Sequence, residues 1–228
     1  MFQLATYNMS KKRANKILKV LRKEFELPNW REKERDPFET LVFTVISQNT
    51  NDRNTARAFE NLSKKFELTP EALSKVDLAE IEEALKVAGL YRNKARVIKK
   101  ISNIILEDFG GSLNFIFETP FEQAREKLLG LPGVGPKTAD VVLLFAANKL
   151  TLPVDTHVNR VSKRLALVDS KAGYKDVRKR LQMLFDSRDY YAVHVFLILH
   201  GRKYCRAANP FCKRCPINHL CPSKLVED

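Results

Sequence analysis

Apolar residues recur at steps of three and four along nearly the whole chain and rarely alternate with polar ones. That spacing collects them on one side of an α-helix, whereas alternation would place them on one face of a strand. Eight glycines and ten prolines in 228 residues leave few interruptions. The pattern therefore predicts an all-α fold. The expected helices follow Ser10, begin near Pro37 and Asp52, lie within 70–74 and 78–87, and cover about 91–109, 121–129, 136–147, 156–167, 174–186 and 189–200.

The charge balance favours a polyanionic partner. Lys and Arg total 40 against 27 Asp and Glu, a net charge of +13, and such a positive surface attracts nucleic acid. The longest apolar runs, 141–147 and 195–199, are far shorter than the ~20 residues that cross a bilayer. The basic residues do not gather on one amphipathic helix, so no membrane contact is expected. The N-terminal segment places its basic residues after a weakly apolar stretch, the reverse of a secretory signal, which favours a cytoplasmic location.

The four cysteines of the chain all lie near its C-terminal end, as Cys205, Cys212, Cys215 and Cys221. Thiolates this close in sequence can bind one metal centre, and disulfides are disfavoured in a chain without an export signal. Zinc sites usually take two C-x2-C pairs, and this segment has a single one. The unequal spacing suits a [4Fe-4S] cluster wrapped by one loop. The spacing favours the cluster and leaves zinc as the alternative.

A glycine-rich turn connects the helices expected at 121–129 and 136–147. Gly133 and Gly135 carry no side chain, so the backbone amides of this turn can approach a phosphate closely, and Pro136 suits the first position of a helix. Lys137 then falls in the first helical turn. We interpret the segment as a helix-hairpin-helix phosphate site; the alternative is an ordinary turn with a solvated lysine.

Asp155 is expected to lie near Lys137. Residues 136–147 as a helix run about 18 Å outward, and the seven residues 148–154, if extended, reach about 23 Å. The chain can therefore return to the start of the helix. Asp155 also precedes an expected helix, so its structural alternative is an N-cap. A lysine and a carboxylate together beside a phosphate site suggest an amine nucleophile with an acid/base or charge-stabilising partner.

The motifs LPGVGPKTADVV, VDTHVNRV and LILHGRKYC, followed by the cysteine spacing, resemble the endonuclease III family. These are bifunctional DNA glycosylases and AP lyases of the helix-hairpin-helix glycosylase superfamily. The resemblance runs from about Pro37 to the C-terminus. It implies a six-helix barrel at 29–149 and an iron-sulfur domain made of 1–28 and 150–228. It also implies that a monomer binds double-stranded DNA containing damaged bases or abasic sites, in the prokaryotic cytoplasm at the nucleoid.

The resemblance also assigns roles to particular residues. Lys137 corresponds to the catalytic lysine, Asp155 to the catalytic aspartate, and the four cysteines to the [4Fe-4S] ligands. Gln48 matches the glutamine that enters the space left by a flipped nucleotide, and Leu90 matches the leucine that wedges beside the opposite base. Further DNA contacts are expected at Gly133, Val134, Gly135, Thr138 and His157.

Three further assignments also have structural alternatives. Gln48 sits where a polar helix end would lie. Leu90 follows Gly89, where a left-handed helix cap is expected, and such caps are accompanied by a hydrophobic contact. His157 has the alternative of a solvated or core histidine.

The implied activity is removal of damaged, oxidised pyrimidines, followed by strand cleavage 3′ to the abasic site through β-elimination from a lysine Schiff base. A mismatch-specific thymine or uracil glycosylase is the first alternative. It would keep Asp155 but would often lack the lysine, so Lys137 argues against it. A non-catalytic DNA-binding module is the second alternative, and the presence of both Lys137 and Asp155 disfavours it.

Overall fold

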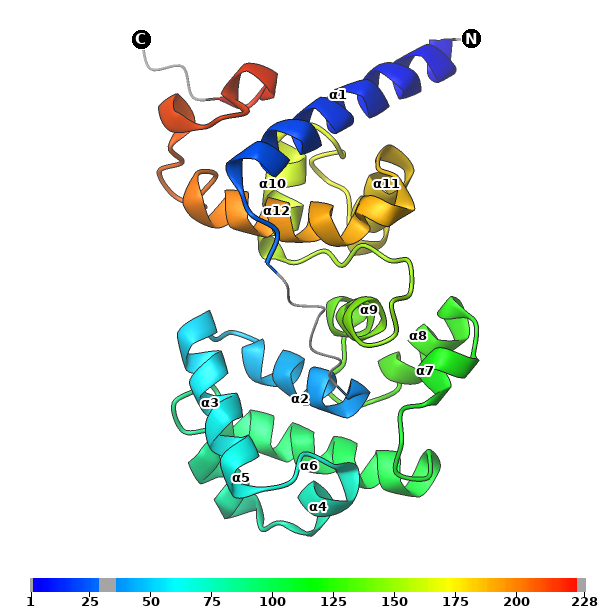
Figure 1. Cartoon of the computed structure of the whole chain (residues 1–228), viewed down its shortest axis with the longest axis vertical. Helices are drawn as coiled ribbons and strands as arrows, with labels where there is room; N and C mark the ends of the chain where they lie inside the picture. Colours follow the sequence, from blue (N-terminus) through cyan, green and yellow to red (C-terminus); the bar gives the residue numbers. More distant parts are fainter. Residues whose placement is uncertain (1, 29–35, 225–228) are drawn as a thin grey trace. The chain divides into compact units, whose positions relative to one another are not determined.

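The computed structural model describes residues 2–28 and 36–224, with side chains from residue 11 onward. Every regular element in the described residues is a helix, which confirms the predicted all-α fold (Figure 1). The chain divides into two compact units: a continuous unit, residues 30–149, and a split unit, residues 1–29 with 150–228. The domain boundary expected at residue 29 falls at the edge of 29–35, outside the described residues.

The continuous unit has one hydrophobic core to which α2, α6 and α9 all contribute. Helix α2 packs against α3, α6 and α9; α4 and α5 pack against α6; and α8 packs against α9. The helices are α2 (Pro37–Ser47), α3 (Asp52–Lys65), α4 (Pro70–Lys75), α5 (Leu78–Ala84), α6 (Tyr91–Asp108), α7 (Phe115–Glu118), α8 (Phe121–Leu129) and α9 (Pro136–Phe145).

Side-chain caps explain where several of these helices begin. Asp36 accepts the Phe38 amide at 2.7 Å, and Asn51 accepts the Asn54 amide at 2.9 Å. Each cap satisfies an amide that has no partner within its own helix. Helices α2, α4 and α9 each start with proline, which suits the first helical position.

The split unit has its own core, formed where α1 packs against α11 and α12 and where α10 packs against α12. Helix α1 contributes Ala14, Ile17, Leu18 and Leu21 to it. The helical segments are α1 (Phe2–Glu24), α10 (Thr156–Arg164), α11 (Tyr174–Leu184), η1 (Ser187–Asp189), α12 (Tyr190–Lys203), η2 (Cys212–Arg214) and η3 (Asn218–Leu220).

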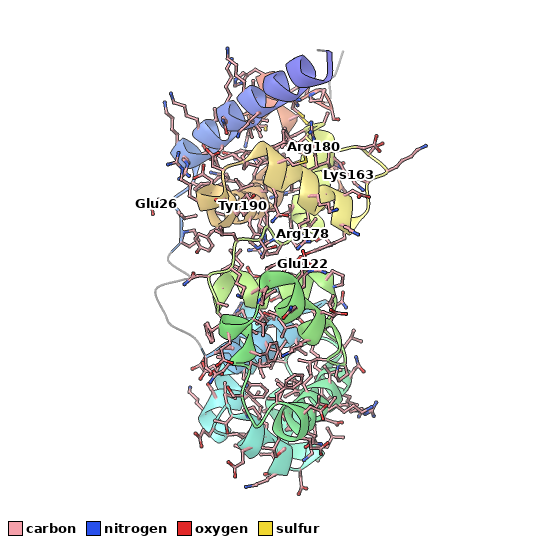
Figure 2. All side chains as sticks on the ribbon, turned by 90° about the vertical axis from the view of Figure 1, so that its right-hand side faces the viewer. Glu26, Glu122, Lys163, Arg178, Arg180 and Tyr190 are labelled. Carbon is pink, nitrogen blue, oxygen red and sulfur yellow. The ribbon has the colours of Figure 1, made fainter. Side chains whose placement is uncertain are left out.

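The outer face of α1 is basic. Lys12, Lys16, Lys19 and Lys23 follow steps of four, three and four residues, so they share one exposed side of the helix, opposite its apolar face. Figure 2 shows nitrogen-tipped side chains extending outward from this helix. The basic residues are thus more concentrated on one helix than the sequence interpretation assumed. Among the described residues, no helix is both long and apolar enough to span a membrane.

Candidate functional site

The predicted hairpin is present in the continuous unit between α8 and α9. Gly130 caps the end of α8, and Gly135 precedes Pro136 at the start of α9. Arg125 of α8 donates through Nε to Oδ1 of Asp140 on α9 at 2.8 Å, and the Asp140 carboxylate is completely buried. Removing one partner of such a pair would leave an uncompensated buried charge. The ion pair therefore holds the two helices of the hairpin together.

The two glycines of the turn have different functions in the fold. Gly133 has φ +73°, and a Cβ at that position would lie 2.8 Å from Cγ1 of Val97. Gly135 has φ −90°, and a Cβ there would meet no atom within 4 Å. The backbone therefore requires glycine at 133 but not at 135. At 135 the missing side chain leaves open space at the start of α9, where the helix dipole favours an anion.

Lys137 lies in the first turn of α9 and is half-buried. The neighbouring Val134 and Thr138 turn their side chains into the core, at 6% and 3% exposure. Any contact that these two residues make with a ligand is therefore a backbone contact.

Gln48 is held against this hairpin. It caps the C-terminal end of α2, and its Nε2 donates to the Gly133 carbonyl at 3.1 Å and to Thr138 Oγ1 at 3.3 Å. The structure thus brings Gln48 to the turn that precedes Lys137, although 85 residues separate Gln48 from Gly133 in sequence.

The left-handed residue between α5 and α6 is Leu90 and not Gly89, so the predicted cap at Gly89 was wrong. Leu90 has φ 57° and is 62% exposed. Glycine at 89 avoids a tight contact instead, because a Cβ there would lie 3.0 Å from the Asn49 carbonyl oxygen. A bulky residue in a left-handed conformation is strained, and such strain persists where the surroundings enforce it. The wedge assigned to Leu90 is thus an exposed side chain on a constrained backbone.

Lys94 is a site residue that the sequence interpretation missed. It lies on the buried side of α6, and its Nζ donates to the Ile46 carbonyl at 2.7 Å and to Thr50 Oγ1. One signal was available in the sequence. Lys94 follows the same steps of four and three as the buried Ile98, Ile101 and Ile105, so a lysine interrupts an apolar stripe.

Asp155 belongs to the split unit and is the N-cap of α10. Its Oδ1 accepts the Val158 amide at 2.7 Å, and the side chain is half-buried. The capping function considered for it is therefore present, and it occupies one of the two carboxylate oxygens. Lys137 belongs to the other unit, so the proximity of the two side chains stays a prediction.

His157 packs against α12. A Cβ at Gly201 would lie 2.9 Å from the His157 Nδ1, and the same nitrogen is 3.0 Å from Arg160 Nη2. Burial lowers the pKa of His157, and the Asp155 carboxylate only partly opposes this effect. His157 is therefore a packed, neutral ring near pH 7. Arg160, which also donates to the Gly201 and Cys205 carbonyls, is a second residue that the sequence interpretation missed.

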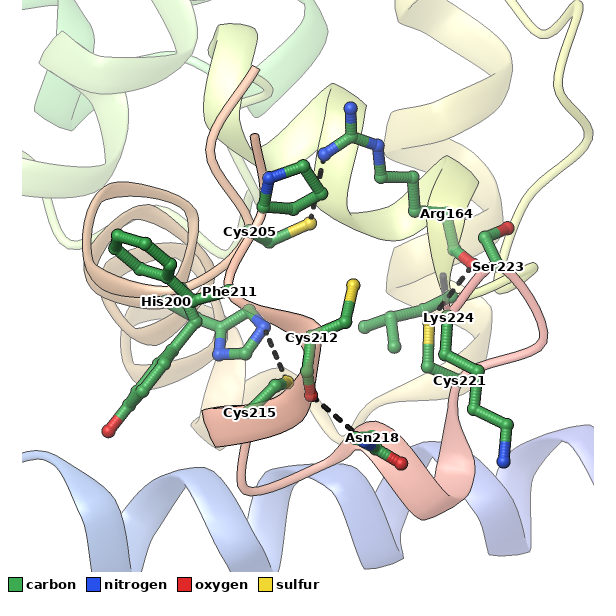
Figure 3. A pocket seen from close by; sticks show the side chains of 13 residues that line it. Arg164, His200, Cys205, Phe211, Cys212, Cys215, Asn218, Cys221, Ser223 and Lys224 are labelled. Carbon is green, nitrogen blue, oxygen red and sulfur yellow. Dashed lines mark hydrogen bonds between the residues drawn. The ribbon is translucent and has the colours of Figure 1, made fainter. Parts of the chain in front are cut away.

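The four cysteines line one cavity of about 160 Å³ (Figure 3). Two cationic or polar side chains face their sulfurs: Arg164 Nη1 is 3.5 Å from the Cys205 Sγ, and His200 Nε2 is 3.7 Å from the Cys215 Sγ. In the described part of the chain, no three cysteine, histidine or carboxylate side chains are close enough to hold a single metal ion. The sulfurs surround a space instead of converging on a point.

Helix α1 secures the cysteine-bearing segment at several places. Arg13 donates to the carbonyls of Leu165 and Leu220. Glu24 Oε1 accepts Lys203 Nζ at 2.7 Å and Tyr204 Oη at 2.6 Å, immediately before Cys205. Helix α1 and the segment that carries the cysteines are therefore bonded together within the split unit.

Comparison with known proteins identifies the class. The sequence profile of the HhH-GPD superfamily, described as base excision DNA repair proteins, matches residues 42–187. The chain belongs to this superfamily.

Individual relatives narrow the assignment. The chain is 35% identical to endonuclease III of Sulfolobus acidocaldarius, over 91% of this chain and 95% of the relative. It is 40% identical to endonuclease III of Bacillus subtilis, over 82% and 81% of the two chains. A solved structure titled as a trapped endonuclease III-DNA covalent intermediate superposes with a TM-score of 0.82 at 33% identity, covering 94% of this chain and 96% of the other. Within the superfamily, the chain belongs to the endonuclease III family of DNA glycosylases and AP lyases, and the predicted resemblance is confirmed.

Proposed function

We propose that this chain acts as a monomer that removes damaged, chiefly oxidised, pyrimidines from duplex DNA and then cuts the strand 3′ to the abasic site. One observation carries the proposal: the Gln48 amide is bonded to the hairpin whose second helix carries Lys137 in its first turn. Leu90, the proposed wedge, is exposed in the same unit. These are the parts needed to open a base pair and attack the sugar of the extruded nucleotide.

The hairpin is proposed to bind the DNA backbone through the amides around Gly133, Val134, Gly135 and Thr138. The open space at Gly135 allows a phosphate to approach the positive end of α9. Gln48 would fill the gap in the stack, and Leu90 would support the base opposite. His157 would add a contact through a neutral ring.

Lys137 is the proposed nucleophile. Its neutral amine attacks C1′ while the bond from C1′ to the base breaks, and the base leaves with the electron pair and gains a proton. The Asp155 carboxylate accepts the amine proton and stabilises the developing positive charge on the sugar. The nitrogen lone pair then forms a second bond to C1′ while the C1′–O4′ bond breaks, and O4′ keeps the electron pair and takes the proton held by Asp155, which gives an open-chain Schiff base. Loss of a proton from C2′ then breaks the C3′–O bond, which cleaves the strand.

The cavity bounded by Cys205, Cys212, Cys215 and Cys221 fits a [4Fe-4S] cluster better than zinc. Its volume of about 160 Å³ is similar to that of a cavity that accepts a benzene ring, about 150 Å³. A cavity of this size holds a group of several atoms, as the cluster is, whereas a zinc ion is a single atom. The nitrogen atoms of Arg164 and His200 face two of the sulfurs, as suits thiolate ligands. Such a cluster, when bound, would supply a covalent crosslink among four thiolates. We assign it a structural function for the C-terminal segment.

Trapping with borohydride tests the central step. Wild-type enzyme mixed with duplexes carrying thymine glycol, uracil, a G·T mismatch or an abasic site should form a covalent complex where it acts, because borohydride reduces a Schiff base to a stable amine. Lys137→Gln should abolish the complex. Lys64→Gln is the control, since it removes one exposed charge that pairs with Glu60 on α3.

Two outcomes would contradict the proposal. Undiminished trapping in Lys137→Gln would assign the nucleophile to another residue. Excision from the G·T or uracil duplex without any trapped complex would favour the mismatch-specific alternative.

A further inference from the structure

Lys94 is a buried lysine for which the proposed chemistry has no direct use. Its side chain is 3% exposed although it ends in an ammonium group. Lysine is rarely buried unless its charge is compensated, because the desolvation penalty is large. Burial accordingly lowers the pKa of Lys94. The contacts of the Lys94 side chain must therefore explain why a charged group is buried at this position.

The Lys94 side chain compensates the partial negative charge at the C-terminal end of α2. Its Nζ donates to the Ile46 carbonyl at 2.7 Å, in the last turn of that helix. The last turn of α2 contains no basic residue of its own. The carbonyls of a final helical turn lack partners and carry partial negative charge, so a cation there is stabilising. Helix α6 therefore supplies the cation that α2 lacks.

The same ammonium reaches the backbone of Gln48 through one intermediary. Lys94 Nζ also donates to Thr50 Oγ1, and the Thr50 hydroxyl donates to the Gln48 carbonyl at 3.2 Å. Gln48 in turn donates to the hairpin at Gly133 and Thr138. A continuous hydrogen-bond path thus runs from α6 to the turn that precedes Lys137.

The backbone of Lys94 is hydrogen-bonded to Leu90, the proposed wedge. Its amide donates to the Leu90 carbonyl at 3.1 Å. Asn49 and Leu90 both have left-handed backbones, at φ 51° and 57°, and Gly89 permits the approach of their two turns. One residue therefore contacts both segments where the backbone is strained.

We propose that Lys94 is a positioning residue that holds Gln48 and Leu90 at a fixed separation before DNA binds. This inference rests on the functions proposed above for those two residues. Fixing them in advance removes an ordering penalty from the step in which both side chains enter the duplex. The benefit is largest where the base pair resists opening. Lys94 thereby makes the rate of excision less dependent on how strongly the damaged base is paired with the base opposite.

The chain provides a matched control on the same helix. Lys99 of α6 is half-buried, and its Nζ donates to the carbonyls of Ser74 and Val76 at the end of α4. It therefore makes the same kind of contact as Lys94, away from Gln48 and Leu90. Lys99→Met and Lys94→Met each remove an ammonium from a helix end and keep the side-chain length.

The test compares one lesion in two settings under single-turnover conditions with saturating enzyme. Thymine glycol is placed opposite adenine or in a mismatch, and 2-aminopurine beside it reports unstacking. Lys94→Met should slow unstacking and excision of the paired lesion by about tenfold, as expected for lost hydrogen bonds to a charged group. The mismatched lesion should be slowed less than about threefold, because its opening needs less assistance. Lys99→Met should leave the excision rates of the paired and the mismatched lesion, and the ratio of these rates, unchanged.

Thr50 gives an independent variant if Lys94→Met does not fold. Thr50→Val keeps the shape but removes the hydroxyl between Lys94 and Gln48, and should shift the paired-to-mismatched ratio in the same direction. Thr50→Ser, which keeps the hydroxyl, should restore the ratio. An unchanged ratio in both Lys94→Met and Thr50→Val, with normal excision by the wild type, would overturn this inference alone. A wild type that neither excises nor is trapped would overturn the proposed function first.

Discussion

At the residue scale, the Asp155 carboxylate caps a helix and is also the proton acceptor in the proposed reaction. One oxygen caps α10 by accepting the Val158 amide, and a carboxylate has a second oxygen with its own lone pairs. The cap orients the side chain at the start of the helix without using all of its hydrogen-bonding capacity. A structural contact and a catalytic function are therefore compatible at this position.

Two substitutions separate these functions. Asp155→Asn should keep the melting temperature close to that of the wild type, because asparagine caps a helix nearly as well as aspartate. It should lower the rate of base excision by roughly 100-fold, because the amide can neither accept the lysine proton nor stabilise positive charge. Asp155→Ala should also lose stability, by about 1 kcal/mol. Near-normal excision by Asp155→Asn would show that the carboxylate is only a cap.

The two hairpin glycines give a second pair of substitutions. Gly133→Ala should destabilise the fold by roughly 1–3 kcal/mol, since it combines a left-handed backbone with a contact to Val97. Gly135→Ala should leave thermal unfolding nearly unchanged but weaken binding to duplex DNA, because the added methyl occupies space offered to a phosphate. Calorimetry and fluorescence anisotropy measure the two effects. Equal DNA affinity in Gly135→Ala and wild type would contradict the proposed phosphate site.

Sequence reasoning at this scale correctly predicted the hairpin and the helix cap at Asp155. It was wrong or incomplete where contacts between distant parts of the chain decide the structure. Glycine was expected to take the left-handed conformation at 89, but Leu90 takes that conformation, and Gly89 instead avoids a tight contact with the Asn49 carbonyl. Lys94 was missed because lysines on amphipathic helices are usually solvated. The hydrogen bonds between Gln48 and the hairpin join residues too distant in sequence for any local pattern to pair them.

At the element scale, periodicity located most helices to within a few residues. Helix α8 has the predicted bounds, whereas α1 begins at Phe2 and not after Ser10. Residues 2–9 contain no glycine or proline to stop a helix, so the helix continues although its apolar pattern begins later. Helix α7 was not predicted, because four residues are too few to show a period. Its buried Phe115 and Ile116 are what hold it in the core.

The lysine face of α1 leads to a prediction about salt dependence. If five to eight phosphates are engaged, the logarithm of the affinity for undamaged duplex should fall against the logarithm of salt concentration with a slope of about 4 to 7. Replacing Lys12, Lys16 and Lys19 by glutamine should lower that slope by roughly one unit or more. We expect this decrease in slope because the three lysines share one exposed face of α1 and can contact phosphates together.

The control replaces three lysines that already pair with glutamates. Lys64, Lys75 and Lys86 lie next to Glu60, Glu71 and Glu83, so their substitution removes the same formal charge but little free positive potential. This variant should change the slope less than the α1 variant does. Equal slopes in the wild type and the α1 variant would exclude α1 from the binding surface, and a flat salt response of the wild type would refute electrostatic binding.

At the scale of the whole molecule, the split unit depends on its cysteine segment more than the continuous unit does. Purified without oxygen, the protein should be yellow-brown and contain iron. Removing the iron should increase amide hydrogen exchange in 205–224 and in α1, which contacts Leu220 through Arg13 and contacts Tyr204, immediately before the segment, through Glu24. Exchange in 36–149 should change little, because the continuous unit has its own core. Stoichiometric zinc without iron, after growth in iron-rich medium, would contradict the cluster.

The order in which the chain is synthesised gives the split unit an unusual folding history. Helix α1 is synthesised before α11 and α12, which cover its apolar face and are encoded some 150 residues later. At about 5–20 residues per second, this delay lasts roughly 8–30 s. The continuous unit can fold around its own core during that interval. Ile17, Leu18 and Leu21 of α1 stay exposed to solvent until α11 and α12 have been synthesised. The apolar face of α1 is therefore exposed to aggregation until α11 and α12 are made, and the cysteine segment is synthesised after both of these helices.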